Sequence, residues 1–193
     1  MLMRPFSMVV DSKAGRLIPH ERINLRRLSD MKRMYVDPEA ELCLGTENPI
    51  IYSFSERVLP EERGHLQLAI TSIRPGKIGQ EYFMTKGHYH ERLDTSEVYL
   101  GLEGEGWLLM QTMEGDFESL PIRPGVAAYI PPFWGHRMVN TGEVPFVFFA
   151  VYSGEAGHNY GDIEEVGFAK ILVERDGNPL LLDHPRWGKG KIS

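Results

Sequence analysis

The sequence has a single cysteine, no long apolar run and no cluster of basic residues. Cys43 has no partner in the chain, which excludes an intrachain disulfide and a CxxC redox site, so we expect it to be a small buried residue. No stretch approaches the roughly 20 apolar residues of a membrane span. The N-terminus also lacks the apolar run and the small-residue cleavage site of a signal peptide. We therefore expect a cytoplasmic protein with no membrane partner.

The net charge of the chain bears on which classes of partner it can bind. The 193 residues carry a formal net charge of −6 at pH 7, and the basic residues are scattered along the chain. Nucleic acids and anionic membranes call for basic patches, so neither is an expected partner. A phosphorylated small molecule remains compatible with this balance, because a local pocket can be positive on an acidic protein. The length suits one domain with a sizeable core.

The middle of the chain, residues 64–152, shows the pattern of an all-β domain. Val98, Leu100 and Leu102 alternate with other side chains at period two, which indicates a strand with two different faces. Further strands are predicted at 107–112, 126–130 and 145–152, separated by glycine-containing turns. Many short strands with regular turn signals favour a sandwich or barrel.

The two ends of the chain give weaker signals. Residues 1–60 are predicted to be an irregular extension that packs on the barrel. It would hold one short helix near 29–35, capped by Ser29, and a turn at Asp37-Pro38. Residues 153–193 are predicted to form a helical turn near 163–168 and two short strands, at 169–173 and 180–182.

The strongest chemical signal is a set of histidines with one glutamate. His88 and His90 lie two residues apart on a predicted strand, so their side chains project from the same face. Glu97 and His136 open later strands. Three imidazoles and a carboxylate suit a divalent ion such as iron, manganese, nickel or zinc. We expect one metal ion at these four residues, and we expect His20, His65 and His184 to lie at the surface.

The same residues occupy the places of known motifs. The chain resembles the first cupin motif through His88, His90, Glu97 and Gly104, and the second through Gly125, Pro131, His136 and Asn140. It departs from the general pattern where Tyr82 and Phe133 stand in place of glycines, and where the gap between His90 and Glu97 is longer than usual. That longer gap, with the stretches 85–99, 129–137 and 156–161, resembles the archaeal cupin-type phosphoglucose isomerase family.

The resemblance implies a fold, an assembly and an activity. The fold would be an all-β cupin, a double-stranded β-helix or jelly-roll barrel with a few short peripheral helices, spanning residues 1–193 as one domain. The assembly would be a homodimer. The activity would be the interconversion of glucose 6-phosphate and fructose 6-phosphate, a step of glycolysis and gluconeogenesis. The metal would commonly be Fe²⁺, with Mn²⁺, Ni²⁺ or Zn²⁺ as alternatives.

The resemblance also implies which residues meet the substrate. The residues expected near the phosphate end are Thr71, Thr85, Gly87, Tyr152, His158 and Tyr160. Lys86 adds nearby charge, directed either to the phosphate or to solvent. Tyr99 shares the face of Glu97 on the strand, so we expect it to line the cavity. Glu97 is the only carboxylate that the motif places at the metal, which makes it the candidate base.

Three choices stay open at the level of sequence. The proton can move through an enediol, or the hydrogen can move as a hydride. The chain can also be another metal-cupin enzyme, either a mannose-6-phosphate isomerase or an iron dioxygenase. Finally, the chain can be a cupin that binds a sugar without catalysing a reaction.

Overall fold

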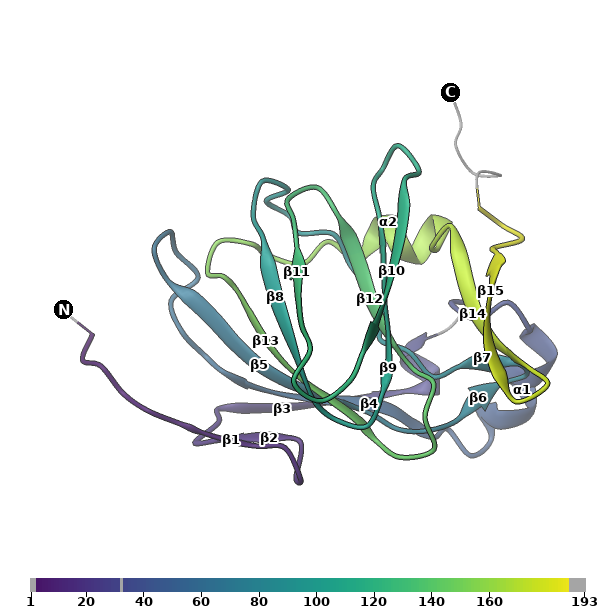
Figure 1. Cartoon of the computed structure of the whole chain (residues 1–193), viewed down its shortest axis with the longest axis horizontal. Coiled ribbons are helices and arrows are strands. Elements are labelled where there is room, and N and C mark those ends of the chain that lie inside the picture. The colour runs from purple at the N-terminus through teal and green to yellow at the C-terminus, as the bar shows by residue number, and fades with distance from the viewer. Residues whose placement is uncertain (1–2, 32, 188–193) are drawn as a thin grey trace.

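Two antiparallel sheets face each other in the computed structural model, which describes residues 3–31 and 33–187 (Figure 1). The larger sheet has the strand order β11-β8-β13-β5-β4-β3. Its strands are β3 (Arg22–Arg27), β4 (Ile50–Arg57), β5 (Leu66–Ile73), β8 (Glu97–Glu103), β11 (Ala127–Ile130) and β13 (Phe146–Ser153). The smaller sheet contains β10 (Phe117–Ile122), β9 (Gly106–Gln111) and β12 (Gly135–Asn140) in that order. Single bridges at Met84–Val139 and His88–His136 attach the segment 84–90 to β12. This is the predicted all-β cupin barrel.

Smaller elements surround the barrel. The hairpin of β1 (Val9–Asp11) and β2 (Arg16–Ile18) packs on the outer face of the larger sheet, where Leu17 contacts Ile70 and Val147. A third sheet has the order β15-β14-β7-β6. Its strands are β6 (Lys77–Ile78), β7 (Glu81–Tyr82), β14 (Lys170–Arg175) and β15 (Asn178–Asp183). The helices are the 3₁₀ turn η1 (Leu28–Met31), α1 (Pro38–Gly45) and α2 (Gly161–Val166). No helix of the described residues is long and apolar enough to cross a membrane.

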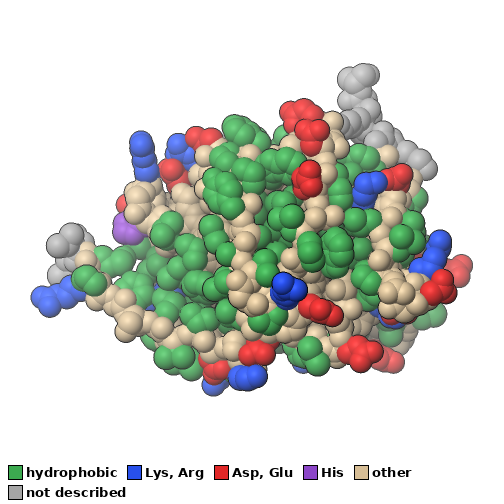
Figure 2. All heavy atoms as spheres, in the orientation of Figure 1, with side chains coloured by type: hydrophobic (Ala, Val, Ile, Leu, Met, Phe, Trp, Pro, Cys, Tyr) green, Lys and Arg blue, Asp and Glu red, His purple; other side chains and the backbone are tan. Residues whose placement is uncertain are grey.

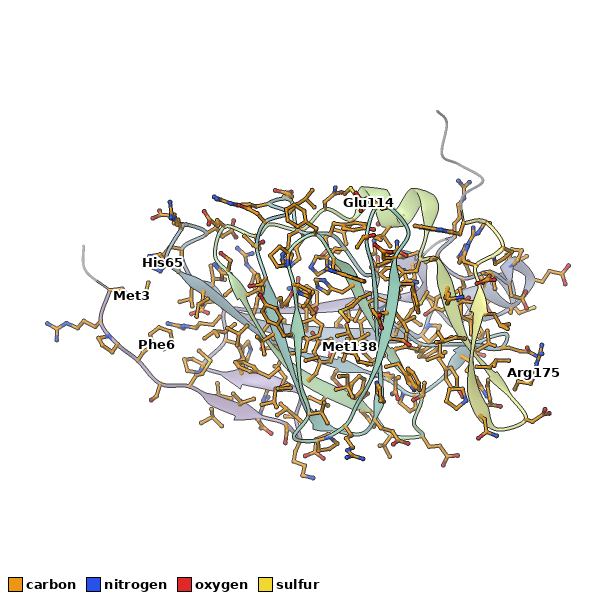
Figure 3. All side chains as sticks on the ribbon, turned by 45° about the horizontal axis from the view of Figure 1, so that its top comes forward. Met3, Phe6, His65, Glu114, Met138 and Arg175 are labelled. Carbon is orange, nitrogen blue, oxygen red and sulfur yellow. The ribbon has the colours of Figure 1, made fainter. Side chains whose placement is uncertain are left out.

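The core lies between the two main sheets. Phe146, Phe148 and Ala150 alternate along β13 and point inward, and each is at most 3 % exposed. Met138 of β12 is fully buried opposite them, whereas Glu114 and Arg175 lie at the periphery (Figure 3). Alternation at period two therefore positions the core.

The N-terminal segment is more ordered than its sequence predicts. Two of its strands, β3 and β4, continue the larger sheet beyond β5, so the segment is not an irregular extension. The predicted helix near Ser29 is only a single 3₁₀ turn. The predicted turn at Asp37-Pro38 instead begins α1: the Asp37 side chain accepts hydrogen bonds from the backbone N–H groups of Glu39 and Ala40.

Two single-residue expectations were also wrong. Cys43 is exposed because α1 has no buried residue and lies on the outside of the molecule. His184, expected at the surface, is 5 % exposed. Its backbone N–H donates to the carbonyl of Ala169 just after β15, which brings the side chain against Gly167. Residues 188–193 of the predicted C-terminal segment lie outside the described residues.

Candidate metal centre and substrate cavity

The four predicted metal ligands come together between the sheets. His88 and His136 are bridge partners, so their rings project side by side from the smaller sheet, with His90 two residues further on. Glu97 is the first residue of β8 in the facing sheet. One donor atom from each of the four side chains lies within 4.8 Å of the others. The strand pairing therefore produces a compact set of three imidazoles and one carboxylate.

Hydrogen bonds fix the orientation of two of the rings. The Nδ1 atom of His90 lies 3.2 Å from the carbonyl oxygen of Thr95 and 2.8 Å from its hydroxyl. The Nδ1 atom of His136 lies 3.3 Å from the carbonyl oxygen of Trp134. A carbonyl can only accept, so Nδ1 carries a proton in each ring, which leaves Nε2 as the atom that can bind a metal. Such partners are typical of histidines that bind metals.

The free nitrogens point at a common centre. The Nε2 atoms of His90 and His136 lie 3.2 and 3.0 Å from Oε2 of Glu97. The Nε2 atom of His88 is buried and has no hydrogen-bond partner among the described residues. Buried polar atoms are normally satisfied, so this unpaired nitrogen fits a ligand whose partner is an ion.

The charge states also fit a metal. Burial, followed by the neighbouring histidines His136, His158 and His90, lowers the pKa of His88 well below its usual value, which keeps its imidazole neutral. Burial opposes ionisation of Glu97, but without a metal the hydrogen bonds and positive charge of protonated His136 and His90 outweigh burial and lower its pKa to about 2. Metal ligands must be deprotonated, and at neutral pH both side chains are.

A cavity of about 520 Å³ opens beside this group. Ala69 and Ala150 lie opposite each other on β5 and β13, and their small side chains leave room between the sheets. Every predicted substrate contact lines the cavity, together with two of the predicted metal ligands: Thr71, Thr85, Gly87, His88, Glu97, Tyr99, Tyr152, His158 and Tyr160.

The segment before His88 presents polar groups to the cavity. The Thr85 hydroxyl oxygen accepts from the backbone N–H of Met138 at 3.1 Å, which leaves the O–H free to donate. Gly87 has φ of +76°, and a Cβ there would come within 2.8 Å of the Phe168 ring. Only glycine fits this position without a shift of the surroundings. Lys86 instead pairs with Glu164 at 2.7 Å.

Aromatic rings and His158 form the wall between the metal ligands and this segment. The His158 ring is 4.5 Å from that of His88 and stacks on Tyr160 with an interplanar angle of 9°. Tyr152 meets His158 edge-on at 5.3 Å. Burial, followed by the charge of the neighbouring Glu97, raises the pKa of Tyr99 well above its usual value. Tyr99 therefore stays protonated and can hold the carboxylate in place.

Sequence reasoning missed the residues that β3 and β4 bring to the cavity. Arg22, Arg26, Tyr52 and Phe54 line it although they belong to the predicted extension. A signal for β3 was present: Ile23 and Leu25 alternate with the polar residues around them. The apolar members are 51 % and 47 % exposed, however, so here it is the polar face that points inward.

Comparison with known proteins assigns the family. Among solved structures, the chain is similar to an oxalate oxidase in complex with the substrate analogue glycolate, with a TM-score of 0.43 and 17 % identity over 51 % of this chain and 47 % of that chain. It is 46 % identical over 184 residues to glucose-6-phosphate isomerase of Thermococcus gammatolerans, covering 95 % of this chain and 97 % of that protein.

The match extends to other archaeal proteins of that name. The chain is 44 % identical over 190 residues to glucose-6-phosphate isomerase of Pyrococcus furiosus, covering 98 % of this chain and 100 % of that protein. The family model described as glucose-6-phosphate isomerase matches residues 25–181. This chain belongs to the glucose-6-phosphate isomerase family.

Proposed function

We propose that this protein interconverts D-glucose 6-phosphate and D-fructose 6-phosphate, using one divalent metal ion per subunit held by His88, His90, Glu97 and His136. The observation that carries the proposal is the placement of this group at a polar cavity that is also lined by hydroxyl groups. Family membership supports the same reaction. Three nitrogen ligands and one carboxylate suit Fe²⁺, and also Mn²⁺, Ni²⁺ or Zn²⁺. The cytoplasmic location stays a prediction.

The reaction needs one base, and Glu97 fits that role. When bound, the metal would polarise the oxygens at C1 and C2 of the sugar and stabilise developing negative charge. Glu97 is ionised, and it is the one carboxylate in the group, so it can take the C2 proton of glucose 6-phosphate and return it at C1, while the hydroxyl proton moves from O2 to O1. The Tyr99 hydroxyl would hold Glu97 during this transfer. An enediol is the intermediate of this route, and a direct hydride shift is the competing route.

A coupled isomerase assay tests the proposal. We expect metal-stripped protein to be inactive and protein reloaded with one metal at a time to recover activity with the native ion. Consumption of oxygen without isomerisation would instead indicate a dioxygenase. Faster turnover of mannose 6-phosphate than of glucose 6-phosphate would indicate the other isomerase. Sugar binding without turnover by any metal-loaded form would indicate a binding protein.

Thr85 and Tyr160 should contribute to substrate binding rather than to metal binding. We expect Thr85→Val and Tyr160→Phe each to lower kcat/KM for fructose 6-phosphate by about one to two decades, because each removes one hydrogen bond to a charged phosphate. Metal content should stay at the wild-type level. Turnover of unphosphorylated fructose, where measurable, should barely change. Equal losses with both sugars, or loss of metal, would contradict this placement of the phosphate.

The outer face of the larger sheet suits a second copy of the chain. Tyr129, Val98, Val151 and Leu68 form a continuous row across β11, β8, β13 and β5. Tyr129 is 58 % exposed and Val98 39 %. Figure 2 shows hydrophobic side chains gathered over this part of the molecule. Exposed apolar areas of this kind are typical of interfaces, so we propose that the homodimer forms here.

A charge placed in this row should separate the dimer. We expect wild-type protein to have a dimeric mass by light scattering at micromolar concentration, and Val98→Lys to have a monomeric mass, because burial of an unpaired ammonium is unfavourable. Val144→Lys is the matched control: Val144 is 56 % exposed but lies in the turn before β13. A monomeric wild type, or a dimeric Val98→Lys, would contradict the proposed interface.

A further inference from the structure

The charges around the cavity do not by themselves favour an anion. Four carboxylates line it, those of Glu56, Glu61, Glu91 and Glu97, against the two cationic side chains of Arg22 and Arg26. A phosphate monoester carries a charge of about −1.5 to −2 at pH 7. Its binding therefore calls for a positive group close to the phosphate. A metal ion would not supply that charge, because its ligands lie at the Glu97 end of the cavity.

Most nearby cations are already engaged. Arg22 is 3.8 Å from Glu56, and its side chain is 60 % exposed. The ammonium of Lys86 is held by Glu164 at 2.7 Å. The guanidinium of Arg137 is buried behind the segment 85–87, where it donates to the carbonyl of Lys86 at 2.6 Å. Lys86 and Arg137 are therefore held away from a phosphate in the cavity, and the charge of Arg22 is paired with Glu56 and screened by solvent.

Arg26 differs from them. It lies on the inner face of β3, directly opposite Tyr52 on β4, and its guanidinium sits 5.4 Å from the centre of the Phe54 ring. It forms no ion pair with any carboxylate in the described part of the chain. Stacking on an aromatic ring leaves the edge of a guanidinium able to donate two parallel hydrogen bonds to a phosphate.

Tyr52 connects Arg26 to the proposed phosphate position. The Arg26 guanidinium and the backbone N–H of Lys86 both lie close enough to the Tyr52 oxygen to favour its ionised form. Burial raises the pKa of Tyr52 to about 12, with Tyr160 as the next contribution. The Tyr52 hydroxyl therefore stays protonated beside Tyr160 and the segment 85–87, and its own proton is available to a ligand.

We propose that Arg26 is a phosphate-binding residue of this cavity, pairing with the sugar phosphate where Tyr52, Tyr160 and the Thr85–Gly87 segment meet. This inference rests on the proposed function and adds a charge that the hydroxyls and the backbone amides do not supply. It gives β3 and β4 a direct part in recognition of the substrate. Arg26 is assigned to binding and takes no part in the transfer of the proton.

The test compares two arginines of one strand. Arg26→Gln should raise KM for fructose 6-phosphate and lower kcat/KM by about 10- to 100-fold, with kcat changed less, because the contact is remote from C1 and C2. Arg22→Gln removes the same charge four residues away and should change kcat/KM by less than about threefold, because solvent screens exposed charges. Metal content should equal that of wild type in both, and Arg26→Lys should recover part of the loss.

A direct measurement separates this inference from the proposed function. Calorimetric titration of metal-free protein with inorganic phosphate should show binding to wild type and to Arg22→Gln, and clearly weaker binding to Arg26→Gln. That result would support the inference even for a protein that does not isomerise glucose 6-phosphate. Equal phosphate binding by wild type and a folded Arg26→Gln protein would overturn it. Equal loss of kcat/KM in Arg26→Gln and Arg22→Gln would also overturn it, since this would indicate that only the net charge near the cavity matters.

Discussion

Glu97→Gln should nearly abolish isomerisation in protein that still contains metal. General acid–base groups contribute about 10²- to 10⁴-fold to a rate, so we expect kcat to fall within that range. Glutamine keeps the size of the side chain and one oxygen that can face His90 and His136, but it cannot accept the C2 proton. Unlike loss of a phosphate contact, this change acts only in the transition state and should leave KM comparatively little changed.

The control for Glu97 is another carboxylate of the same cavity. Glu91 also lines the cavity and is exposed, so Glu91→Gln removes an equal charge without touching the metal group. Elemental analysis of Glu97→Gln must first show bound metal at the wild-type level. If the metal-loaded variant stayed active, Glu97 would be a ligand only. Retention of deuterium from C2-labelled substrate at C1 would then favour the hydride shift, whereas its loss to water would favour the enediol.

The site could be predicted because its four residues match the spacing of known motifs. The two-residue spacing of His88 and His90 indicates a shared face, although the segment 84–90 forms single bridges rather than the predicted strand. The cupin spacing then indicates Glu97 and His136. The long gap before Glu97 proved compatible with the site because the loop folds back. The Thr95 hydroxyl donates to the carbonyl of Arg92 at 2.7 Å while Thr95 also meets the His90 ring. Such a loop cannot be derived from spacing alone.

One departure from the cupin motif has a clear structural account. Phe133 occupies a place where the motif has glycine, and its φ is +72°, a conformation that suits glycine. The ring is 58 % exposed, and the backbone N–H donates to the carbonyl of Leu93 at 2.8 Å. The turn before β12 therefore forms without glycine because a tertiary hydrogen bond holds its backbone.

The N-terminal part of the sheet was not predictable by the same reasoning. In β3 the polar residues Arg22, Asn24 and Arg26 face the cavity, while Ile23 and Leu25 point outward. Interpretation of a strand assumes that its apolar face is buried, and a polar cavity inverts that rule. The start of α1 was readable, since an Asp before a Pro matches an N-cap followed by a first-turn proline. The register of β3 against β4 depends on contacts distant in sequence.

Loss of either His88 or His136 should remove both metal and activity. Each would withdraw one of four ligands, and changes of residues that merely orient ligands already weaken metal affinity by about 10- to 100-fold. We therefore expect His88→Ala and His136→Ala to lose more than about 100-fold in affinity and to retain almost no metal after dialysis. Isomerase activity should be at background, because polarisation of the C1 and C2 oxygens is lost with the ion.

Two further variants serve as controls for the loss of metal. His65→Ala removes a partly exposed histidine outside the group and should leave the metal content unchanged. Thr95→Val removes only the hydroxyl 2.8 Å from Nδ1 of His90, so it should weaken metal binding by about 10-fold while full occupancy remains attainable. We expect metal affinity to decrease in the order His65→Ala, Thr95→Val and then the two ligand variants. This order would indicate that the metal centre is built from His88, His90, Glu97 and His136. Undiminished metal in both His88→Ala and His136→Ala would place the ion elsewhere. The position of Glu97 beside three imidazoles would then not be explained by metal binding.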